Sequence, residues 1–391
     1  MSHYYKSSKL QNVCYDIRGP VLHRANELEE EGYRILKLNI GNPAAFGFNA
    51  PEEIIQDVIR LLPESEGYSD SKGLYSARKA IMQECQKIGI PGVEVNDIYL
   101  GNGCSELITM ATQALLNIGD EVLIPSPDYP LWTAGVSLSG AKPVHYLCDE
   151  ENDWQPSLDD IRAKITDKTR AIVIINPNNP TGQIMLRNDL QRLAQFAHEH
   201  DIQLWVDEVF RGITVDGGPV TPSIRDIDSG TISTGSMSKS FGLSGLRVGG
   251  IAAPEEVLEA FRHIRFYTTV TAPVVEQKIA AVAHRNRDKV IGRNQAILDK
   301  NYTYLKQWMG ERNGVFDWVA PKGGPVTFPK FIDSVSTDDF CLKLAEDYSV
   351  LLPPGNYSFS AEGFIRIGYG QSRRFEEAMS RVGDALEEFL S

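Results

Sequence analysis

A single lysine stands in the segment STGSMSKSFGLSGLRVGG, residues 233–250. The short run TIST (231–234) predicts a strand, so Lys239 falls in a loop of small residues at a strand end. A lysine amine that is partly removed from water is less readily protonated and becomes a nucleophile. The ordinary alternative is a solvated surface lysine, and residues elsewhere must decide between the two.

Two more predicted strands end in polar groups. Asp207 closes the apolar run IQLWVD, where a buried carboxylate is costly unless it meets a cation. Asn179 lies in NPNNPTG (176–182), a rigid turn that follows the apolar run AIVII. A helix cap or structural ion pair is the plain alternative for Asp207, and an ordinary proline turn is that for Asn179.

A glycine-containing turn follows a fourth predicted strand, DIYL (97–100). In GNGCSE, Gly103 permits a tight turn, and the amides of Cys104 and Ser105 open the helix expected over 106–116. The partial positive charge of a helix N-terminus favours a phosphate. A simple helix cap by Ser105 explains the same residues.

Short apolar runs alternate with longer amphipathic ones, which predicts parallel strands connected by helices in an α/β fold. Ligands bind at the carboxyl ends of the strands in such a sheet, so the polar groups above are expected to meet there. A long polar helical stretch (275–312) and a closing helix follow the sheet region. The expected strands are 97–100, 121–125, 171–176, 202–207, 231–234 and 247–253.

Composition excludes several classes of protein. The 391 residues carry a formal net charge of −13 without a basic run, so nucleic acid is not an expected partner. The five cysteines are scattered and never spaced as CxxC, which argues against a disulfide framework or a metal site and favours the cytoplasm. We expect neither a signal peptide nor a membrane span. A nicotinamide dehydrogenase is disfavoured because no GxGxxG follows an early strand.

The motifs NPNNPTG, DEVF and SMSKSFGLSGLR stand in one order along the chain. In this combination the sequence resembles the fold-type I enzymes that use pyridoxal phosphate, specifically the class I/II aminotransferases. The resemblance implies a large α/β/α domain with a mostly parallel mixed sheet and a smaller α/β domain. We expect an N-terminal arm and part of the small domain over 1–47, the large cofactor domain over 48–265 and the small domain over 266–391.

The resemblance implies that four residues contact the cofactor ring. Lys239 corresponds to the lysine that binds pyridoxal phosphate covalently and moves a proton between the substrate Cα and the cofactor C4′. Asp207 corresponds to the carboxylate that keeps the pyridine nitrogen protonated, which makes the ring an electron sink. Asn179 matches the asparagine beside the ring oxygen O3′, and Tyr129 in SPDYP matches the aromatic residue that stacks on the ring.

The resemblance also assigns the phosphate and the substrate carboxylate. Tyr68 matches a tyrosine that reaches the phosphate of a neighbouring subunit, which implies a homodimer with shared active sites. Arg366 in FIRIGYG matches the arginine that binds the α-carboxylate through its fork of donors, with the Gly41 backbone close by. The implied phosphate-binding groups are Gly103, Cys104, Ser105, Ser236 and Arg247.

The first half of the chain is similar to the alanine aminotransferase branch, in segments such as YDIRGP (15–20) and GYSDSKGLYSAR (67–78). In that branch Tyr15 lies near a small substrate pocket and Arg18 helps to recognise a second carboxylate. Docking of the arm to the body is the plain alternative for both residues. The second half departs from the branch, because Phe210 stands where family members commonly have a tyrosine.

These features predict an aminotransferase that exchanges an amino group between an L-amino acid, alanine or glutamate, and a 2-oxo acid by a ping-pong mechanism. The same site could instead support elimination, cyclisation or oxidation of an amino acid. A regulator that senses pyridoxal phosphate is a third reading. It is disfavoured because such regulators carry a DNA-binding domain, for which this acidic chain has no room ahead of its arm.

Overall fold

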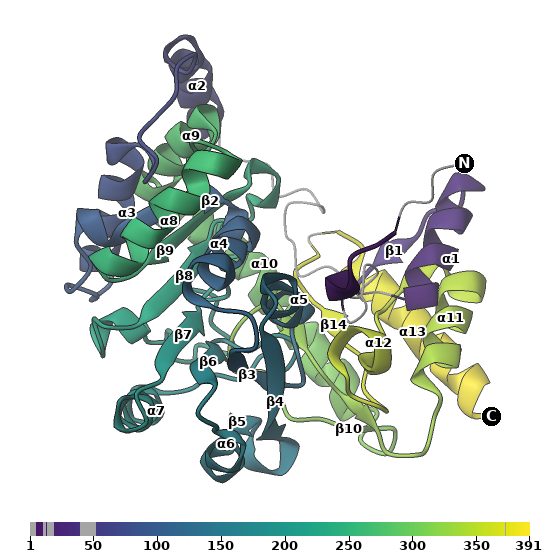
Figure 1. Ribbon diagram of the computed structural model, residues 1–391. Helices are drawn as coiled ribbons and strands as arrows, with labels where there is room; N and C mark the ends of the chain where they lie inside the picture. The colour runs from purple at the N-terminus through teal and green to yellow at the C-terminus, as the bar shows by residue number, and fades with distance from the viewer. Residues whose placement is uncertain (1–4, 11–12, 14–18, 40–51, 372) are drawn as a thin grey trace.

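The computed structural model describes residues 5–10, 13, 19–39, 52–371 and 373–391. An eight-stranded sheet forms the centre of the larger lobe (Figure 1). Neighbouring strands from β8 through β7, β6 and β3 to β4 are parallel, whereas β9 runs antiparallel to both of its neighbours, β2 and β8, and β5 runs antiparallel to β4. The fold class expected from the sequence, α/β with a mostly parallel mixed sheet, is confirmed. In sheet order the strands are β2 (Ile98–Asn102), β9 (Val248–Ala252), β8 (Ile232–Ser236), β7 (Gln203–Asp207), β6 (Thr169–Ile175), β3 (Glu121–Ser126), β4 (Lys142–Asp149) and β5 (Gln155–Pro156).

Helices cover both faces of the sheet, which is why its central strands are apolar on successive residues. In β3, Val122 and Ile124 pack in one cluster with residues of α4, α5 and α8, while Leu123 packs on the opposite face with residues of α6 and α7. Helices α2, α3 and α9 lie together at the β2–β9 end of the sheet (Figure 1). These helices are α2 (Glu52–Leu61), α3 (Tyr75–Lys87), α4 (Gly103–Leu115), α5 (Pro130–Ser139), α6 (Leu158–Lys164), α7 (Arg187–Glu199), α8 (Glu255–Thr268) and α9 (Val274–Arg285).

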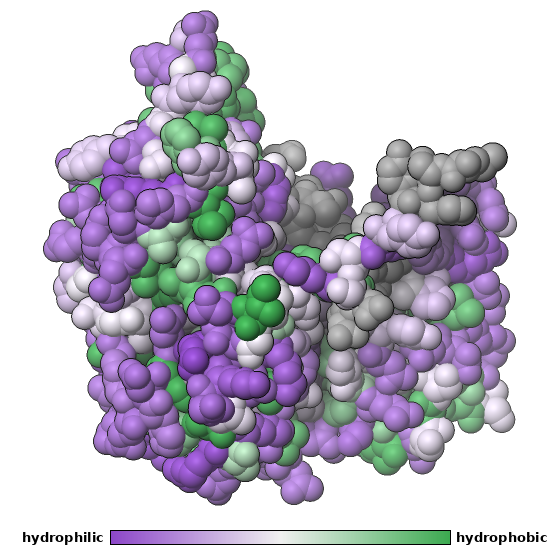
Figure 2. Space-filling view, viewed as in Figure 1, coloured by the Kyte–Doolittle hydropathy of each residue, from purple (hydrophilic) through white to green (hydrophobic). Residues whose placement is uncertain are grey.

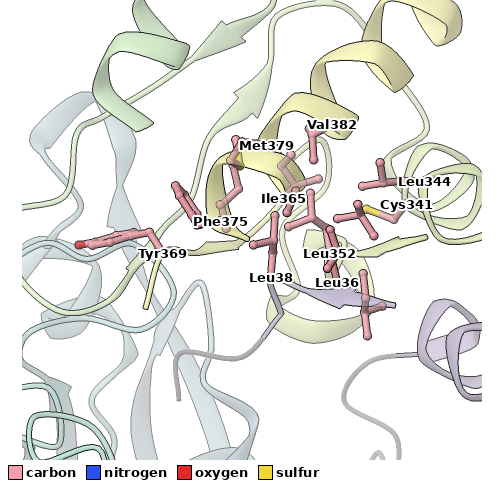
Figure 3. Packing of buried hydrophobic residues seen from close by; sticks show 14 of the residues in the cluster. Leu36, Leu38, Cys341, Leu344, Leu352, Ile365, Tyr369, Phe375, Met379 and Val382 are labelled. Atoms are coloured by element: carbon pink, nitrogen blue, oxygen red, sulfur yellow. The ribbon is translucent and has the colours of Figure 1, made fainter. Parts of the chain in front are cut away.

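The smaller lobe has its own apolar core, part of which Figure 3 shows. Segments far apart in the sequence meet there: β1 (Leu36–Lys37) pairs in parallel with β13 (Val350–Leu351), and α1 (Gly19–Glu30) packs on α11 (Thr337–Tyr348). Its remaining elements are β10 (Phe316–Asp317), β11 (Val326–Thr327), β12 (Lys330–Phe331), β14 (Ile367–Gly368), α12 (Gly355–Phe359) and α13 (Phe375–Leu390).

The long helical stretch expected over 275–312 forms two helices, α9 and α10 (Arg287–Gly310), which meet at Asn286. Helix α10 spans both lobes, because Val290 packs with α9 whereas Leu298 and Leu305 belong to the smaller lobe's core. The domain boundaries at 47 and 265 stay a prediction.

No helix in the described part of the chain is both long and apolar enough to cross a membrane. The four described cysteines, Cys85, Cys104, Cys148 and Cys341, are all buried and free.

Candidate active site

A cavity of about 400 Å³ opens at the carboxyl edge of the large sheet. The parallel strands all end at this edge, and β9, being antiparallel, begins there. Residues from separate strand ends therefore converge on one space. Nine of the predicted site residues line it, namely Cys104, Ser105, Tyr129, Asn179, Asp207, Ser236, Lys239, Arg247 and Arg366.

The other predicted site residues are not among the described residues that line this cavity. Tyr15, Arg18 and Gly41 lie outside the described residues. Tyr68 is not part of the cavity wall, and its side chain is 87% exposed. Gly103 is the first residue of α4, immediately before Cys104 and Ser105.

Asp207 ends β7 and is 3% exposed. The Trp132 indole Nε1 donates a hydrogen bond to Asp207 Oδ2 at 3.1 Å, and the Val209 backbone N–H donates to Oδ1 at 3.0 Å. Burial, aided by the charge of Glu208, raises the pKa of Asp207 from 3.8 to about 6 against the opposing effect of these hydrogen bonds. A cation placed against this carboxylate would favour its ionised form.

Lys239 lies in the loop between β8 and β9, three residues after Ser236, the last residue of β8. Helices α9 and α10 contact the residues of this loop that follow Lys239. Asn294 of α10 donates to the Ser240 carbonyl at 2.8 Å, and the Phe241 ring packs edge-on against His284 of α9 with centroids 4.8 Å apart. Contacts on both following residues thus fix the backbone that presents the lysine to the cavity.

The N-terminus of α4 and Arg247 form one end of the cavity. Gly103 has φ = +72°, and a Cβ added there would collide with the Arg247 guanidinium, so only glycine allows this approach. Arg247 itself takes the left-handed conformation, φ = +52°, which is uncommon outside glycine and clusters at functional sites. The Ser236 hydroxyl, from the end of β8, also lines the cavity. Helix amides, a hydroxyl and a guanidinium together suit a phosphate group.

Arg366, the residue before β14, comes from the smaller lobe. Its Nη1 donates to Asn179 Oδ1 at 2.9 Å and its Nη2 to the Asn39 carbonyl at 2.6 Å. The Phe359 ring lies 4.7 Å from the guanidinium carbon. Because Asn179 Oδ1 accepts from the arginine, its Nδ2 is left as a donor for another group.

Sequence reasoning missed Trp132, Asn39 and Phe359, all of which line the cavity or hydrogen-bond to groups that line it. Trp132 has a recognisable signal, since it follows Tyr129 by three residues at the start of α5 and so shares its face of the helix. Asn39 and Phe359 meet Arg366 only through the tertiary fold.

We predict that Trp132→Phe removes a hydrogen bond to Asp207 while it keeps an aromatic ring packed in the core. The variant keeps an aromatic ring but removes the N–H that bonds to Oδ2. Loss of a hydrogen bond to a buried charged group costs about 1.5–3 kcal/mol, so turnover should fall by about 10- to 100-fold. Steady-state kinetics measure the loss, and circular dichroism checks the fold. Unchanged kinetics in a folded variant would show that the indole N–H plays no part.

Phe210 is buried and lines the same cavity, with its ring against Gly324. A tyrosine there could donate a hydrogen bond to the cofactor's O3′, and phenylalanine cannot. We predict that the cofactor linkage to Lys239 holds its proton to higher pH in the native protein than in Phe210→Tyr. A pH titration of the cofactor's visible absorbance measures the difference, and identical titration curves would contradict the prediction.

Pyridoxal phosphate fits this arrangement. Asp207 is buried where a protonated ring nitrogen would favour its charge. The absence of a Cβ at Gly103 leaves a space between the α4 N-terminus and the Arg247 guanidinium, which we call the Gly103 cradle. Lys239, Asn179 and Tyr129 line the same cavity as Asp207 and Arg247. Asp207 would hold the ring nitrogen, Lys239 the aldehyde carbon, and the Gly103 cradle the phosphate.

Comparison with known proteins agrees with the geometry. The chain is 58% identical over 255 residues to glutamate-pyruvate aminotransferase AlaA of Escherichia coli K12, a match that covers 64% of this chain and 62% of that protein's length. It is 40% identical to the alanine aminotransferase of Mycobacterium bovis, over 98% of this chain and 92% of that protein.

Solved structures show the same fold. A crystal structure of an aminotransferase from Escherichia coli superposes with a TM-score of 0.88 at 42% identity, covering 100% of both chains. Alanine aminotransferase from Pyrococcus furiosus gives 0.89 at 30% identity, covering 98% of this chain and 100% of the other. The family model described as aminotransferase class I and II matches residues 33–382. The chain therefore belongs to the class I and II aminotransferases, the family that its strand-end motifs resemble.

Proposed function

We propose that this protein is a pyridoxal-phosphate-dependent aminotransferase that moves an amino group between an L-amino acid and a 2-oxo acid. The observation that supports this most is the convergence of Lys239, Asp207 and Arg366 on one cavity. Arg366 comes from the smaller lobe and the other two from strand ends of the larger lobe. The family's cofactor is pyridoxal phosphate, and when bound it supplies an electron sink for the substrate Cα.

Each residue then has a distinct task. The Arg366 guanidinium binds the substrate α-carboxylate, because its planar fork matches two carboxylate oxygens. Lys239 Nζ takes the proton from the substrate Cα and returns a proton at C4′, as a general base and then a general acid. Asp207, held by Trp132, keeps the ring nitrogen protonated. The α4 N-terminus, Ser236 and Arg247 anchor the phosphate end.

We propose alanine and glutamate as amino donors, with pyruvate and 2-oxoglutarate as acceptors. The proposal rests on the relatives, which are named glutamate-pyruvate aminotransferase and alanine aminotransferase. Among the described lining residues the cations are Lys239, Arg247 and Arg366, and all three already have tasks. We assign the second carboxylate of glutamate to Arg18, the side of the small pocket to Tyr15 and a backbone contact with the α-carboxylate to Gly41.

A panel of amino donors tested against pyruvate and 2-oxoglutarate examines this function. We expect alanine with 2-oxoglutarate, and glutamate with pyruvate, to give the highest kcat/KM. Arg18→Ala should lower kcat/KM for glutamate far more than for alanine. Failure of every donor in the panel to give its 2-oxo acid would contradict the proposed reaction, whereas a different best donor would contradict the substrate alone.

We propose a homodimer with shared active sites. Ile54, Val58 and Leu61 of α2 pack against α9, whereas Ile55 and Ile59, which point to another side of the helix, are exposed. Figure 2 shows hydrophobic surface on this protruding part of the molecule. Further along the chain Leu62, Tyr68 and Tyr75 are exposed, as are Phe266 and Tyr267 of α8.

This surface suits a second copy of the chain, and Tyr68 would then reach the phosphate of the partner's cavity. Sedimentation should give twice the chain mass of 43.5 kDa. Tyr68→Phe should weaken retention of the cofactor, as measured by its absorbance after dialysis. A monomer at enzymatic concentrations with full activity would contradict shared sites. We also propose that the protein works in the cytoplasm, which the four described cysteines, all buried and free, support.

A further inference from the structure

The loop that carries Lys239 is folded tightly on itself. The Gly242 backbone N–H donates to the Lys239 carbonyl at 3.0 Å, and the Leu243 N–H donates to the Met237 carbonyl at 3.0 Å. Gly242 has φ = +68°, the left-handed conformation that lets the chain turn back at this point. These two hydrogen bonds join the residues on both sides of the lysine, so a shift in one part of the loop moves the lysine with it.

A side chain of α10 donates a hydrogen bond to this loop from outside the active site. Asn294 is 4% exposed, and its Nδ2 donates to the carbonyl of Ser240, the residue after Lys239, at 2.8 Å. Asn294 is not among the described residues that line the cavity. Any effect of this side chain on the reaction therefore has to pass through the loop.

Asn294 stands on a part of α10 that other helices hold in place. Glu84 of α3 hydrogen-bonds to His284 near the end of α9 and accepts from Arg287 Nε, in the first turn of α10, at 2.8 Å. Val290, one turn before Asn294, packs in an apolar cluster with residues of α9 and of the lysine loop. The start of α10 is thus fixed by polar and apolar contacts, and Asn294 transmits that fixed position to the loop.

We propose that Asn294 is a positioning residue for Lys239, and that its hydrogen bond to the Ser240 carbonyl sets where the amine stands relative to the substrate Cα. This inference rests on the proposed aminotransferase function. Proton transfer needs the two heavy atoms within about 2.6–3.2 Å, and a misplacement of about 1 Å can cost about 10²-fold in rate. Loss of the hydrogen bond should therefore slow proton transfer, while affinity for the substrate carboxylate, the task of Arg366, should be kept.

The test compares Asn294→Ala with the native holoenzyme in the donor half-reaction, followed by cofactor absorbance in a stopped-flow instrument. We expect the limiting rate with L-alanine to fall by about 10- to 100-fold, the effect of a displaced catalytic group. The apparent Kd for L-alanine and the inhibition constant of propionate, which has the carboxylate without the amino group, should change little. Deuterium at the alanine Cα should slow the variant at least as much as it slows the native protein, because proton transfer is the affected step.

Two further variants separate the hydrogen bond from packing and from helix stability. Asn294→Leu keeps the branched shape of asparagine without its donor, so its limiting rate should fall like that of Asn294→Ala. Asn301→Ala is the matched control, because Asn301 lies two turns further along the same side of α10. Asn301 is also buried, but its Nδ2 donates to the carbonyls of Tyr369 and Gln371. This variant should lose thermal stability and keep the native limiting rate.

The possible outcomes separate this inference from the proposed function. A native protein that shows no half-reaction with any amino acid would overturn the function itself. A native protein that reacts while Asn294→Ala and Asn294→Leu keep its limiting rate would overturn only the role of Asn294. That role would also be overturned if leucine restored the native rate, since packing would then be sufficient, or if Asn301→Ala were slowed equally, since lost helix stability would then explain the effect.

Discussion

Replacement of Lys239 by alanine is expected to lower turnover by at least about 10²–10⁴-fold, the usual contribution of a positioned acid–base group. The purified variant should still bind pyridoxal phosphate, because the phosphate cradle and Asp207 are intact. The cofactor should be held without a covalent bond, and so should be removed by gel filtration under denaturing conditions even after borohydride reduction, which fixes the linkage to Lys239 in the native protein. Absorbance spectra and steady-state rates measure both effects.

Lys322→Ala is a suitable control, since this amine lies at the surface in a 2.7 Å ion pair with Asp153. It should keep both the covalent linkage and the turnover of the native protein. Normal transamination by Lys239→Ala, or a cofactor that remains covalently attached in it, would contradict the assignment of the reactive amine.

Replacement of Asp207 by asparagine should impair function and stabilise the cofactor-free fold. Removing one partner of a buried ion pair costs about 3–5 kcal/mol, so turnover should fall by about 10²–10⁴-fold. The effect on stability follows from the pKa, which burial raises from 3.8 to about 6. The folded protein thus favours the neutral acid. The contribution of this group to the free energy of unfolding is fully present below about pH 4 and is lost as pH rises to about 6.

Above pH 6 the ionised carboxylate therefore costs the cofactor-free fold about 3 kcal/mol, at 1.36 kcal/mol per pKa unit. Asparagine keeps the shape and carries no charge, so the variant should be more stable than the native protein at pH 8 and similar to it at pH 4. Denaturant unfolding of both proteins without cofactor measures the difference. A stability difference that does not depend on pH would contradict this explanation, and native turnover in the variant would contradict the ring-nitrogen role.

The sequence predicted the strands that are buried on both faces, and missed β4. AIVII in β6 and LWV in β7 are apolar on successive residues, which is typical of strands covered by helices. Strand β4, Lys142–Asp149, begins with Lys-Pro and alternates in burial near the edge of the sheet, so its pattern is weak. The antiparallel direction of β9 was not predicted, because pairing direction depends on the connections and not on the strand's own residues.

Residues of the site that follow strands could be predicted because the chemistry stands directly after an apolar run, as Asp207 does after β7. Contacts between residues far apart in the sequence could not be predicted. Trp132 and Asp207 are 75 positions apart, and Asn39 and Arg366 are 327 apart. Neither pair has a local pattern, because each contact depends on how helices and lobes pack around the sheet.

The donor half-reaction tests the central claim most directly. L-Alanine is added to the holoenzyme without any 2-oxo acid, and the cofactor spectrum and the released products are measured together. A transaminase should convert its bound cofactor fully to the amino form and release one pyruvate per site without ammonia. Release of ammonia with the cofactor still in its aldehyde form, or no spectral change with any amino acid of the donor panel, would contradict the account.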